Sequence, residues 1–369
     1  MHITAVHTIG VGSTGAPISD ASRQNILRLL RTEEGVYDRA HARTLSVLSA
    51  WTYSDEGTFA AVMSRRRLEG CDYVEISTRN DALFFDTSAV LVQSPGRKLT
   101  ILSFRGTQPQ NAINWLTGVS ARAEYFPAGG KVHGGFQRGL RSTWPVLQEL
   151  LLAALNARPI CDALAHSREK YLSPCGAAKP EAPVSMVPAP ITDAIPEEKE
   201  LLPSLYITGH SLGGALAVLA AALLYAQADA GVFGRDRRQV RSWIRGVYTY
   251  GQPMVGDAAF ASMNGDLGKK LFRHVYRRDI VPRLPPRIMG DFMHFGQQYD
   301  SSEASWMPGT RPARQAISLG LSNLVGVLSW FTQDVVPLQW VRLPFSWGDH
   351  SPLNYMRTSL EAAPGEEFD

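Results

Sequence analysis

A serine held between glycines at a strand-to-helix junction is the feature that most constrains how this chain can fold. Leu205 to Thr208 form a short β-rich run, Gly209-His210-Ser211-Leu212-Gly213 follows, and an Ala/Leu-rich segment up to Gln227 predicts a long helix. The turn needs small residues two places before and after the serine, because its backbone is strained and the strand and helix pass close by. A chance match among 32 glycines is the alternative, which the flanking elements disfavour. The pattern therefore predicts an elbow that presents Ser211 as a nucleophile.

Strands alternate with helices along the rest of the chain. Apolar spacing predicts helices over residues 20–32, 39–51 and 136–155, and β-rich runs predict strands at 89–93, 99–104, 246–250 and 271–277. This alternation indicates an α/β sheet. Residues 156–203 are rich in Pro and Ala and end in a charged cluster, so we expect an inserted loop within a single domain spanning residues 1–369.

Charged residues are few in this sequence. They make up 19% of the chain, whereas a typical soluble domain has about 25%. Either an unusually large share of the chain is buried, or part of its surface faces something other than water. The hydrophobic fraction of 44% is enough for a sizeable core, and a net charge of +3 predicts no nucleic-acid partner.

Signals for cofactors, disulfides and export are weak. Cys71, Cys161 and Cys175 are too few for a disulfide framework or a metal cage. One disulfide between Cys161 and Cys175 and three free thiols are equally good interpretations. No metal, nucleotide or flavin motif appears, so we expect no cofactor. Residues 1–20 lack the basic start and apolar run of a secretory leader, which predicts a cytoplasmic protein or export without a recognisable leader.

A serine nucleophile requires a base to take its proton and a carboxylate to orient that base. In α/β-hydrolases the order along the chain is serine, acid, histidine. Asp279 lies just past a predicted strand, where the acid belongs. Among the downstream histidines, His274 lies inside a strand and is expected to be structural, whereas His294 and His350 compete as the base. We favour His350, on a loop before the last helix, with Asp349 beside it as a solvated charge.

Seven segments together resemble the class 3 lipases, a branch of the α/β-hydrolases. The similarity covers residues 39–155 and 204–360, and the segments are FRGT (104–107), NW (114–115), VHGGF (132–136), GHSLGGALA (209–217), YGQPMVGDAAFA (250–261), RRDIVPRLPP (277–286) and DHSPLNY (349–355). The resemblance implies an α/β-hydrolase fold whose mostly parallel sheet has helices on both faces. It implies Ser211, Asp279 and His350 as the catalytic triad, Thr107 and Leu212 as the oxyanion hole, and a structural role for His294.

Two further segments bear on the substrate. Residues 108–120 have an apolar stripe at helical spacing; in the family this segment is the lid, although an ordinary surface helix is the alternative. Residues 306–347 hold four of the eight tryptophans. Within them, the uncharged run from Gln315 to Gln333 has too many polar residues for a transmembrane span. We interpret 306–347 as an apolar cap that meets acyl chains or transiently a lipid surface, with core packing as the alternative.

The resulting hypothesis is a serine carboxylic ester hydrolase, with a triacylglycerol or another hydrophobic ester as its substrate. A phospholipase A1 and a feruloyl-type esterase are the alternatives within the same chemistry. A non-catalytic lipid-binding member of the fold is a remote alternative, because a binding module has no need of an intact Ser, Asp and His set.

Overall fold

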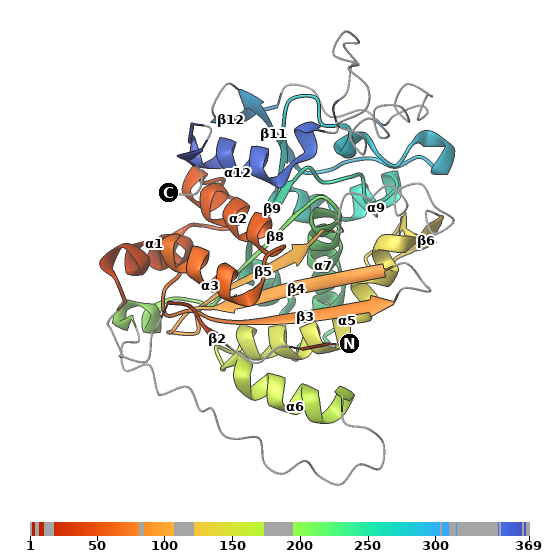
Figure 1. Ribbon diagram of the computed structural model, residues 1–369. Helices are drawn as coiled ribbons and strands as arrows, with labels where there is room; N and C mark the ends of the chain where they lie inside the picture. Colours follow the sequence, from red (N-terminus) through yellow and green to blue (C-terminus); the bar gives the residue numbers. More distant parts are fainter. Residues whose placement is uncertain are drawn as a thin grey trace.

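The computed structural model describes residues 2–3, 7–10, 18–80, 85–106, 122–172, 195–302, 305–309, 315, 346, 348–363 and 365–366. A ten-stranded sheet runs through the centre of the molecule in the order β1-β3-β4-β5-β8-β9-β10-β11-β12, with β2 paired to β3 (Figure 1). Its strands are β1 (His2–Ile3), β2 (His7–Thr8), β3 (Asp72–Asn80), β4 (Phe85–Gln93), β5 (Leu99–Arg105), β8 (Ser204–His210), β9 (Ile244–Tyr250), β10 (Leu271–Val275), β11 (Gln297–Ser302) and β12 (Ser305–Pro308). A separate hairpin pairs β6 (Ala123–Tyr125) with β7 (Lys131–His133).

The centre of the sheet is parallel and its edges are antiparallel. Strands β5, β8, β9, β10 and β11 run parallel to one another. The pairs β3–β4, β4–β5 and β11–β12 are antiparallel. Parallel strands are covered on both faces and are therefore apolar along their length. All seven residues of β8 are buried accordingly. Because these strands point the same way, the loops that follow them meet at one edge, where a ligand site of an α/β protein is expected.

Helices cover both faces of the sheet. On one face α2 packs on β8 and β9 and is covered by α12, while on the other face α5 and α7 pack on the strands. The helices are α1 (Asp20–Arg31), α2 (Arg39–Trp51), α3 (Glu56–Arg65), α5 (Gly134–Leu155), α6 (Ile160–Leu172), α7 (Leu212–Asp229), α8 (Arg237–Trp243), α9 (Ala258–Met263), α10 (Gly265–Gly268) and α12 (Pro352–Leu360). Short 3₁₀ turns are η2 (Pro196–Glu200), η3 (Val281–Arg283), η4 (Arg287–Met289) and η5 (Gly348–His350).

Side chains at the helix starts explain where two of the N-terminal helices begin. The Ser19 hydroxyl accepts a hydrogen bond from the Ser22 amide at the start of α1, and the Asp38 carboxylate accepts from the first amides of α2. Such caps satisfy backbone N–H groups that have no partner within the helix. Both helices match the predicted ranges, because the periodic apolar residues and the caps agree.

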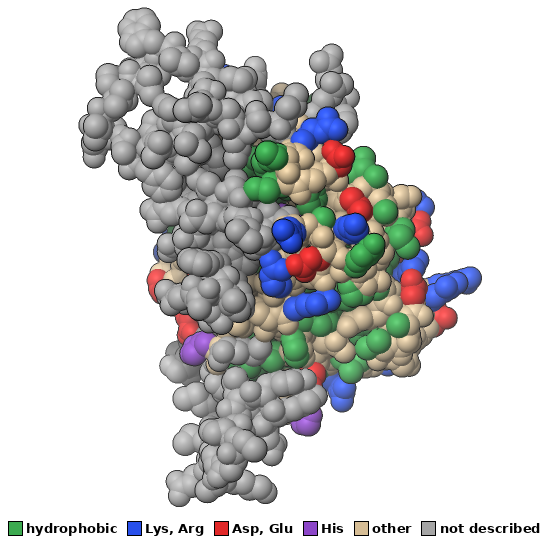
Figure 2. Space-filling model, turned by 90° about the vertical axis from the view of Figure 1, so that its right-hand side faces the viewer, with side chains coloured by type: hydrophobic (Ala, Val, Ile, Leu, Met, Phe, Trp, Pro, Cys, Tyr) green, Lys and Arg blue, Asp and Glu red, His purple; other side chains and the backbone are tan. Residues whose placement is uncertain are grey.

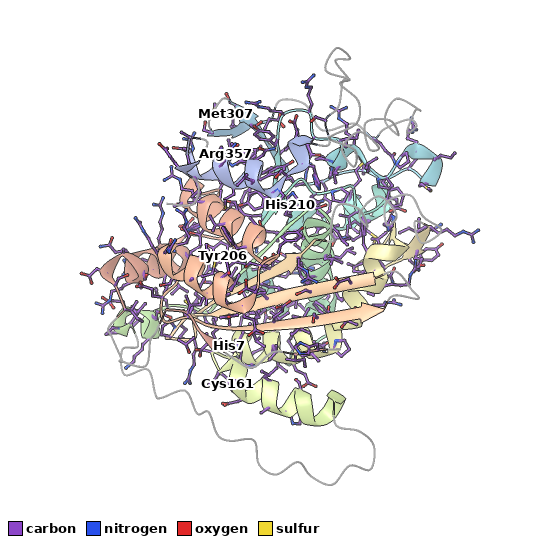
Figure 3. The ribbon with its side chains drawn as sticks, in the orientation of Figure 1. His7, Cys161, Tyr206, His210, Met307 and Arg357 are labelled. Carbon is purple, nitrogen blue, oxygen red and sulfur yellow. The ribbon has the colours of Figure 1, made fainter. Side chains whose placement is uncertain are left out.

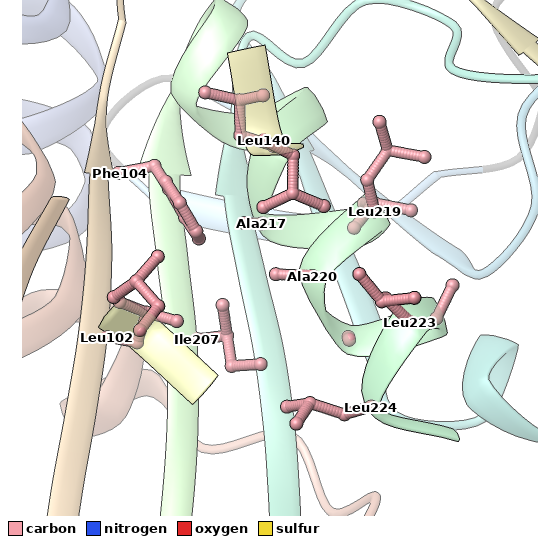
Figure 4. Close-up of a cluster of buried hydrophobic side chains, with 14 of the residues drawn as sticks. Leu102, Phe104, Leu140, Ile207, Ala217, Leu219, Ala220, Leu223 and Leu224 are labelled. Carbon is pink, nitrogen blue, oxygen red and sulfur yellow. The ribbon is translucent and has the colours of Figure 1, made fainter. Parts of the chain in front are cut away.

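Helix α7 lies in the centre of the core. Its alanines allow it to approach the sheet closely, and Leu102 of β5 and Ile207 of β8 share one buried cluster with Ala217 and Ala220 (Figure 4). Among the described residues, α7 alone is long and apolar enough to cross a membrane, and 83% of its apolar window is buried inside the protein. The helix is therefore core scaffold, and it accounts for part of the low charge content.

The prediction of a loop over residues 156–203 is wrong for its first part. Residues 160–172 form α6, which packs against α5 because Ile160 and Leu164, spaced one helical turn apart, are buried in the main core. Residues 173–194 lie outside the described residues. Cys161 carries a free thiol, and Cys175 also lies outside the described part of the chain.

The predicted apolar cap at 306–347 begins in the core. Trp306 belongs to the edge strand β12, is 4% exposed, and donates its indole N–H to the Ser359 hydroxyl at 2.9 Å. For this residue core packing, the alternative interpretation, is correct. Residues 310–314, 316–345 and 347 lie outside the described residues.

Candidate active site

Ser211 occupies the strained turn between β8 and α7. Its φ of 58° and ψ of −128° are rarely adopted by a residue with a side chain. A Cβ on Gly209 would overlap the Gly213 carbonyl, and one on Gly213 would overlap the carbonyl of Phe104 in β5. The two glycines of the motif are therefore required by close backbone approach. The Ser211 amide donates to the Tyr250 carbonyl at 2.9 Å, which holds the turn against β9.

The structure brings Ser211, His350 and Asp279 together from three separate segments. His350 Nε2 lies 2.7 Å from Ser211 Oγ, and His350 Nδ1 lies 2.7 Å from Asp279 Oδ2. All three side chains are buried. This arrangement can remove the serine proton through the imidazole, while the carboxylate holds the ring and stabilises its positive form.

Asp279 lies in the loop after β10, and its carboxylate accepts hydrogen bonds from three donors. The Val281 amide donates to Oδ1 at 2.8 Å, and the Tyr355 hydroxyl and His350 both contact Oδ2. The Tyr355 hydroxyl in turn accepts from the Tyr276 amide at 3.1 Å. Tyr355 was not predicted as a site residue, although it closes the DHSPLNY motif. Only the packing of α12 against the sheet brings its hydroxyl to Asp279.

The loop that carries His350 is bonded to the loop that carries Asp279. The Ser346 amide donates to the Arg278 carbonyl at 2.9 Å, and the Arg278 amide donates to Asp349 Oδ2 at 3.1 Å. Asp349 is therefore more than the solvated charge that we expected. These backbone contacts fix the distance between the acid and the base before any substrate binds.

The two other downstream histidines are held by backbone carbonyls away from Ser211. His274 is fully buried in β10, and its Nδ1 lies 3.0 Å from the Thr249 carbonyl. Burial lowers the pKa of His274 to about 3, so the ring is neutral. His294 Nε2 lies 2.7 Å from the Pro282 carbonyl. Burial also lowers the pKa of His294 well below its usual value. Neither ring contacts Ser211.

The predicted oxyanion hole is described in part. Leu212 is the first residue of α7, where amide N–H groups have no partner within the helix and the helix dipole favours negative charge. Its N–H is therefore suited to a developing oxyanion beside Ser211. Thr107 and the predicted lid at 108–120 lie outside the described residues, although Gly106 at the end of β5 is included.

Gly251 is the glycine whose replacement would disturb the site most directly. Its φ is +60°, and a Cβ there would lie 2.9 Å from His350 Nδ1 and 3.0 Å from Asp279 Oδ2. We expect Gly251→Ala to lower kcat by about 10²-fold by displacing the imidazole. Gly231→Ala is the matched control, because Gly231 also has a positive φ, +71°, but no atom lies within 4 Å of its Cβ position. The kcat with a soluble ester and the melting temperature are measured for both variants. Equal kcat values would show that a side chain at position 251 does not displace His350.

Metal ligation has no support in the described part of the chain. No group of three or more His, Cys, Asp or Glu side chains is placed there to hold a metal ion.

Comparison with known proteins places this geometry in context. The sequence model for Lipase (class 3) matches residues 101–289. A lipase of Rhizomucor miehei is 31% identical over 219 residues, which are 59% of this chain and 46% of that protein. Triacylglycerol lipase OBL1 of Nicotiana tabacum is 31% identical over 249 residues, 55% of this chain and 41% of that protein. The chain thus spans less than half the length of these two relatives.

A solved structure shows the same fold. A deletion mutant of the Rhizomucor miehei lipase propeptide complex superimposes with a TM-score of 0.53 at 20% identity, covering 96% of this chain and 99% of that one. Its similarity confirms the predicted fold class, with helices on both faces of a sheet whose centre is parallel.

Proposed function

This chain belongs to the class 3 lipase family, and from that membership we propose that it is a serine carboxylic ester hydrolase acting on lipid esters of the triacylglycerol type. The observation that carries the proposal is the continuous contact from Ser211 through His350 to Asp279, at 2.7 Å for each step. The two relatives described above are named as a lipase and a triacylglycerol lipase.

The proposed reaction proceeds through an acyl-enzyme. His350 Nε2 takes the Ser211 proton as Oγ attacks the ester carbonyl, and the negative charge of the tetrahedral intermediate develops beside the Leu212 amide. His350 then gives its proton to the departing alcohol, which leaves the acyl group on Ser211. Water, deprotonated by the same imidazole, attacks the acyl-enzyme and releases the carboxylic acid. Asp279 stays ionised and stabilises the imidazolium in both halves of the reaction.

An apolar rim beside the site supports a water-insoluble substrate. It consists of four exposed side chains, Tyr125, Met263, Ile288 and Met293, with exposures of 78%, 68%, 84% and 44%. Three of them lie on connected segments, because Gly256 bridges both β7 and Met293, and Met263 lies over the turn of the β6–β7 hairpin that contains Tyr125. Ile288 lies in η4, the 3₁₀ turn that precedes Met293 in sequence. The hairpin strand β6 lies at the right-hand side of Figure 1, and this side faces the viewer in Figure 2. There, hydrophobic side chains are exposed among charged ones. Connected exposed apolar side chains are typical of a surface that meets a partner or a lipid.

The rim is linked to the triad through short loops. The Met254 amide donates to the Leu284 carbonyl at 2.8 Å, and the His133 amide donates to the Val255 carbonyl at 2.9 Å. The segment 251–256 therefore connects Gly251, whose Cβ position lies against His350, with Gly256 in the rim. In this proposal residues 108–120 remain the candidate lid.

The substrate class predicts different responses to rim variants. We expect the double variant Met263→Glu and Ile288→Glu to lower hydrolysis of a triolein emulsion about tenfold, because two charges would have to approach the lipid. Hydrolysis of dissolved p-nitrophenyl butyrate should stay within about twofold, because the triad is untouched. Leu202→Glu is the matched control. Leu202 is 72% exposed but precedes β8, at the opposite end of that strand from Ser211.

The same assay separates the proposal from its alternatives. Wild-type protein should hydrolyse triolein emulsions faster than phosphatidylcholine vesicles or a dissolved feruloyl ester. A preference for the vesicles would indicate a phospholipase, and a preference for the feruloyl ester without any gain at an interface would remove the lipase assignment. If the rim variant and Leu202→Glu lost the same fraction of their triolein hydrolysis, the rim would have no role in binding the emulsion.

A further inference from the structure

His210, the residue before the nucleophile, contacts both the backbone and the ring of His350. Its side chain is 3% exposed, and its Nε2 lies 2.9 Å from the His350 carbonyl oxygen. A carbonyl only accepts, so the proton of the imidazole is on Nε2. The two rings lie 4.6 Å apart between centroids. In Figure 3 the labelled His210 lies near the centre of the molecule, where β8 meets the helical cover.

The other nitrogen of His210 faces a tyrosine. Burial, followed by repulsion from His350, holds the pKa of His210 well below its usual value, so the ring is neutral. With a proton on Nε2, its Nδ1 is an acceptor. The Tyr53 hydroxyl lies 3.4 Å from Nδ1 and is the donor that this nitrogen requires.

Tyr53 in turn contacts the end of β5. A Cβ on Gly106 would overlap the Tyr53 hydroxyl and would lie 2.8 Å from the His210 carbonyl oxygen. The glycine is therefore required by this close approach.

The bonds form one series in which each group donates to the next. Tyr53 O–H donates to His210 Nδ1, and His210 Nε2–H donates to the His350 carbonyl. Hydrogen bonds aligned in this way strengthen one another, and a buried group that loses its partner destabilises the whole series. Tyr53 lies against Gly106, the residue after β5. The series therefore connects the end of β5, the strand before Thr107 and here called the oxyanion strand, with the loop of the catalytic base.

We propose that Tyr53 and His210 are positioning residues that set the oxyanion strand and the catalytic histidine in register with each other. The inference rests on the proposed ester hydrolysis and extends it. Asp279 holds the ring of His350, and the Tyr53–His210 link holds its backbone, so the imidazole is fixed at two points. A displacement of about 1 Å between reacting groups can lower a rate about 10²-fold, which is why such a link matters for kcat.

Removing the Tyr53 hydroxyl tests the link with the smallest change. We expect Tyr53→Phe to lower kcat for p-nitrophenyl butyrate about tenfold, the loss expected from one hydrogen bond, with KM within about twofold. The rate of covalent labelling by a phosphonate ester should fall by the same factor, because it reports the same serine activation. Tyr206→Phe is the matched control, since that buried hydroxyl donates to the Leu29 carbonyl at 2.8 Å, away from the triad.

His210 variants separate positioning from packing. His210→Phe keeps an aromatic ring without either nitrogen, whereas His210→Gln keeps an N–H that can donate. We expect the order of kcat to be wild type, then Gln, then Phe. Combining Tyr53→Phe with His210→Phe should lower kcat by less than the product of the two single effects, because both break the same series.

The folded wild-type protein provides a test without any substitution. A long-range ¹H–¹⁵N spectrum should show His210 as the neutral tautomer protonated on Nε2. The proposal is overturned if His210 carries its proton on Nδ1, or if Tyr53→Phe keeps wild-type kcat. It is also overturned if Tyr53→Phe and Tyr206→Phe lower the melting temperature equally and also lower kcat by the same factor. A wild-type protein that hydrolyses no ester would instead contradict the proposed function, so the two failures are distinguishable.

Discussion

Replacing Ser211 with alanine is expected to lower kcat for p-nitrophenyl butyrate by about 10⁴-fold or more, since removal of a serine nucleophile has effects of this size in other triads. The change removes Oγ, the atom that lies 2.7 Å from His350 Nε2. Alanine has the same backbone requirements as serine at a φ of 58°, so the strain of the turn is retained and the melting temperature should change little. Steady-state kinetics and thermal unfolding of the same preparation test both statements.

Ser204→Ala is the control for loss of a buried serine hydroxyl. Ser204 starts β8, at the opposite end of that strand from Ser211, and its hydroxyl accepts from Arg245 Nε at 3.1 Å. We expect its kcat to stay within about threefold of wild type. If Ser211→Ala kept wild-type turnover, the hydrolysis would come from another group and the proposed mechanism would be wrong.

Replacing Asp279 with asparagine is expected to lower kcat by about 10³- to 10⁴-fold. A neutral amide does not stabilise the imidazolium that forms when His350 takes the serine proton. Its NH₂ group would also face a donor, because the Val281 amide and the Tyr355 hydroxyl both donate to the present carboxylate. Either orientation of the amide leaves a buried donor without an acceptor, so a lower melting temperature should accompany the lower kcat.

Asp349→Asn is the matched control for loss of a carboxylate near the base. Asp349 is adjacent to His350 in sequence, and its Oδ2 accepts from the Arg278 amide, a bond that an asparagine oxygen can retain. Its kcat should therefore stay within about threefold. A larger loss for Asp349→Asn than for Asp279→Asn would reverse the assignment of the acid.

The buried elements could be predicted from the sequence because local pattern and tertiary environment agree there. Strand β8 and helix α7 are apolar along their whole length, and Gly209 and Gly213 mark the turn between them. Strand β3, Asp72–Asn80, was not predicted, because its antiparallel pairing keeps polar residues in a strand that has few continuous apolar positions. Helix α6 was missed because it begins a Pro- and Ala-rich stretch and has a short apolar face. Among its described side chains, Ile160 and Leu164 are buried in the main core and Ala163 packs beside them.

The site divides in the same way. Ser211, Asp279 and His350 were predictable because motif order and family resemblance both point to them. Tyr53, His210 and Tyr355 act through hydroxyl and ring contacts between segments more than 70 residues apart, as the separations of 157, 140 and 76 positions along the chain show. No local pattern encodes such a contact, since it depends on how α2 and α12 pack on the sheet.

Mass spectrometry of the protein after reaction with a phosphonate ester tests the central claim most directly. We expect a single adduct per chain, located on the peptide that contains Ser211, with parallel loss of ester turnover. Ser211→Ala should remain unlabelled, and Asp279→Asn should be labelled far more slowly than wild type. Labelling of another residue together with loss of turnover, or full turnover in a protein completely labelled at Ser211, would contradict the account.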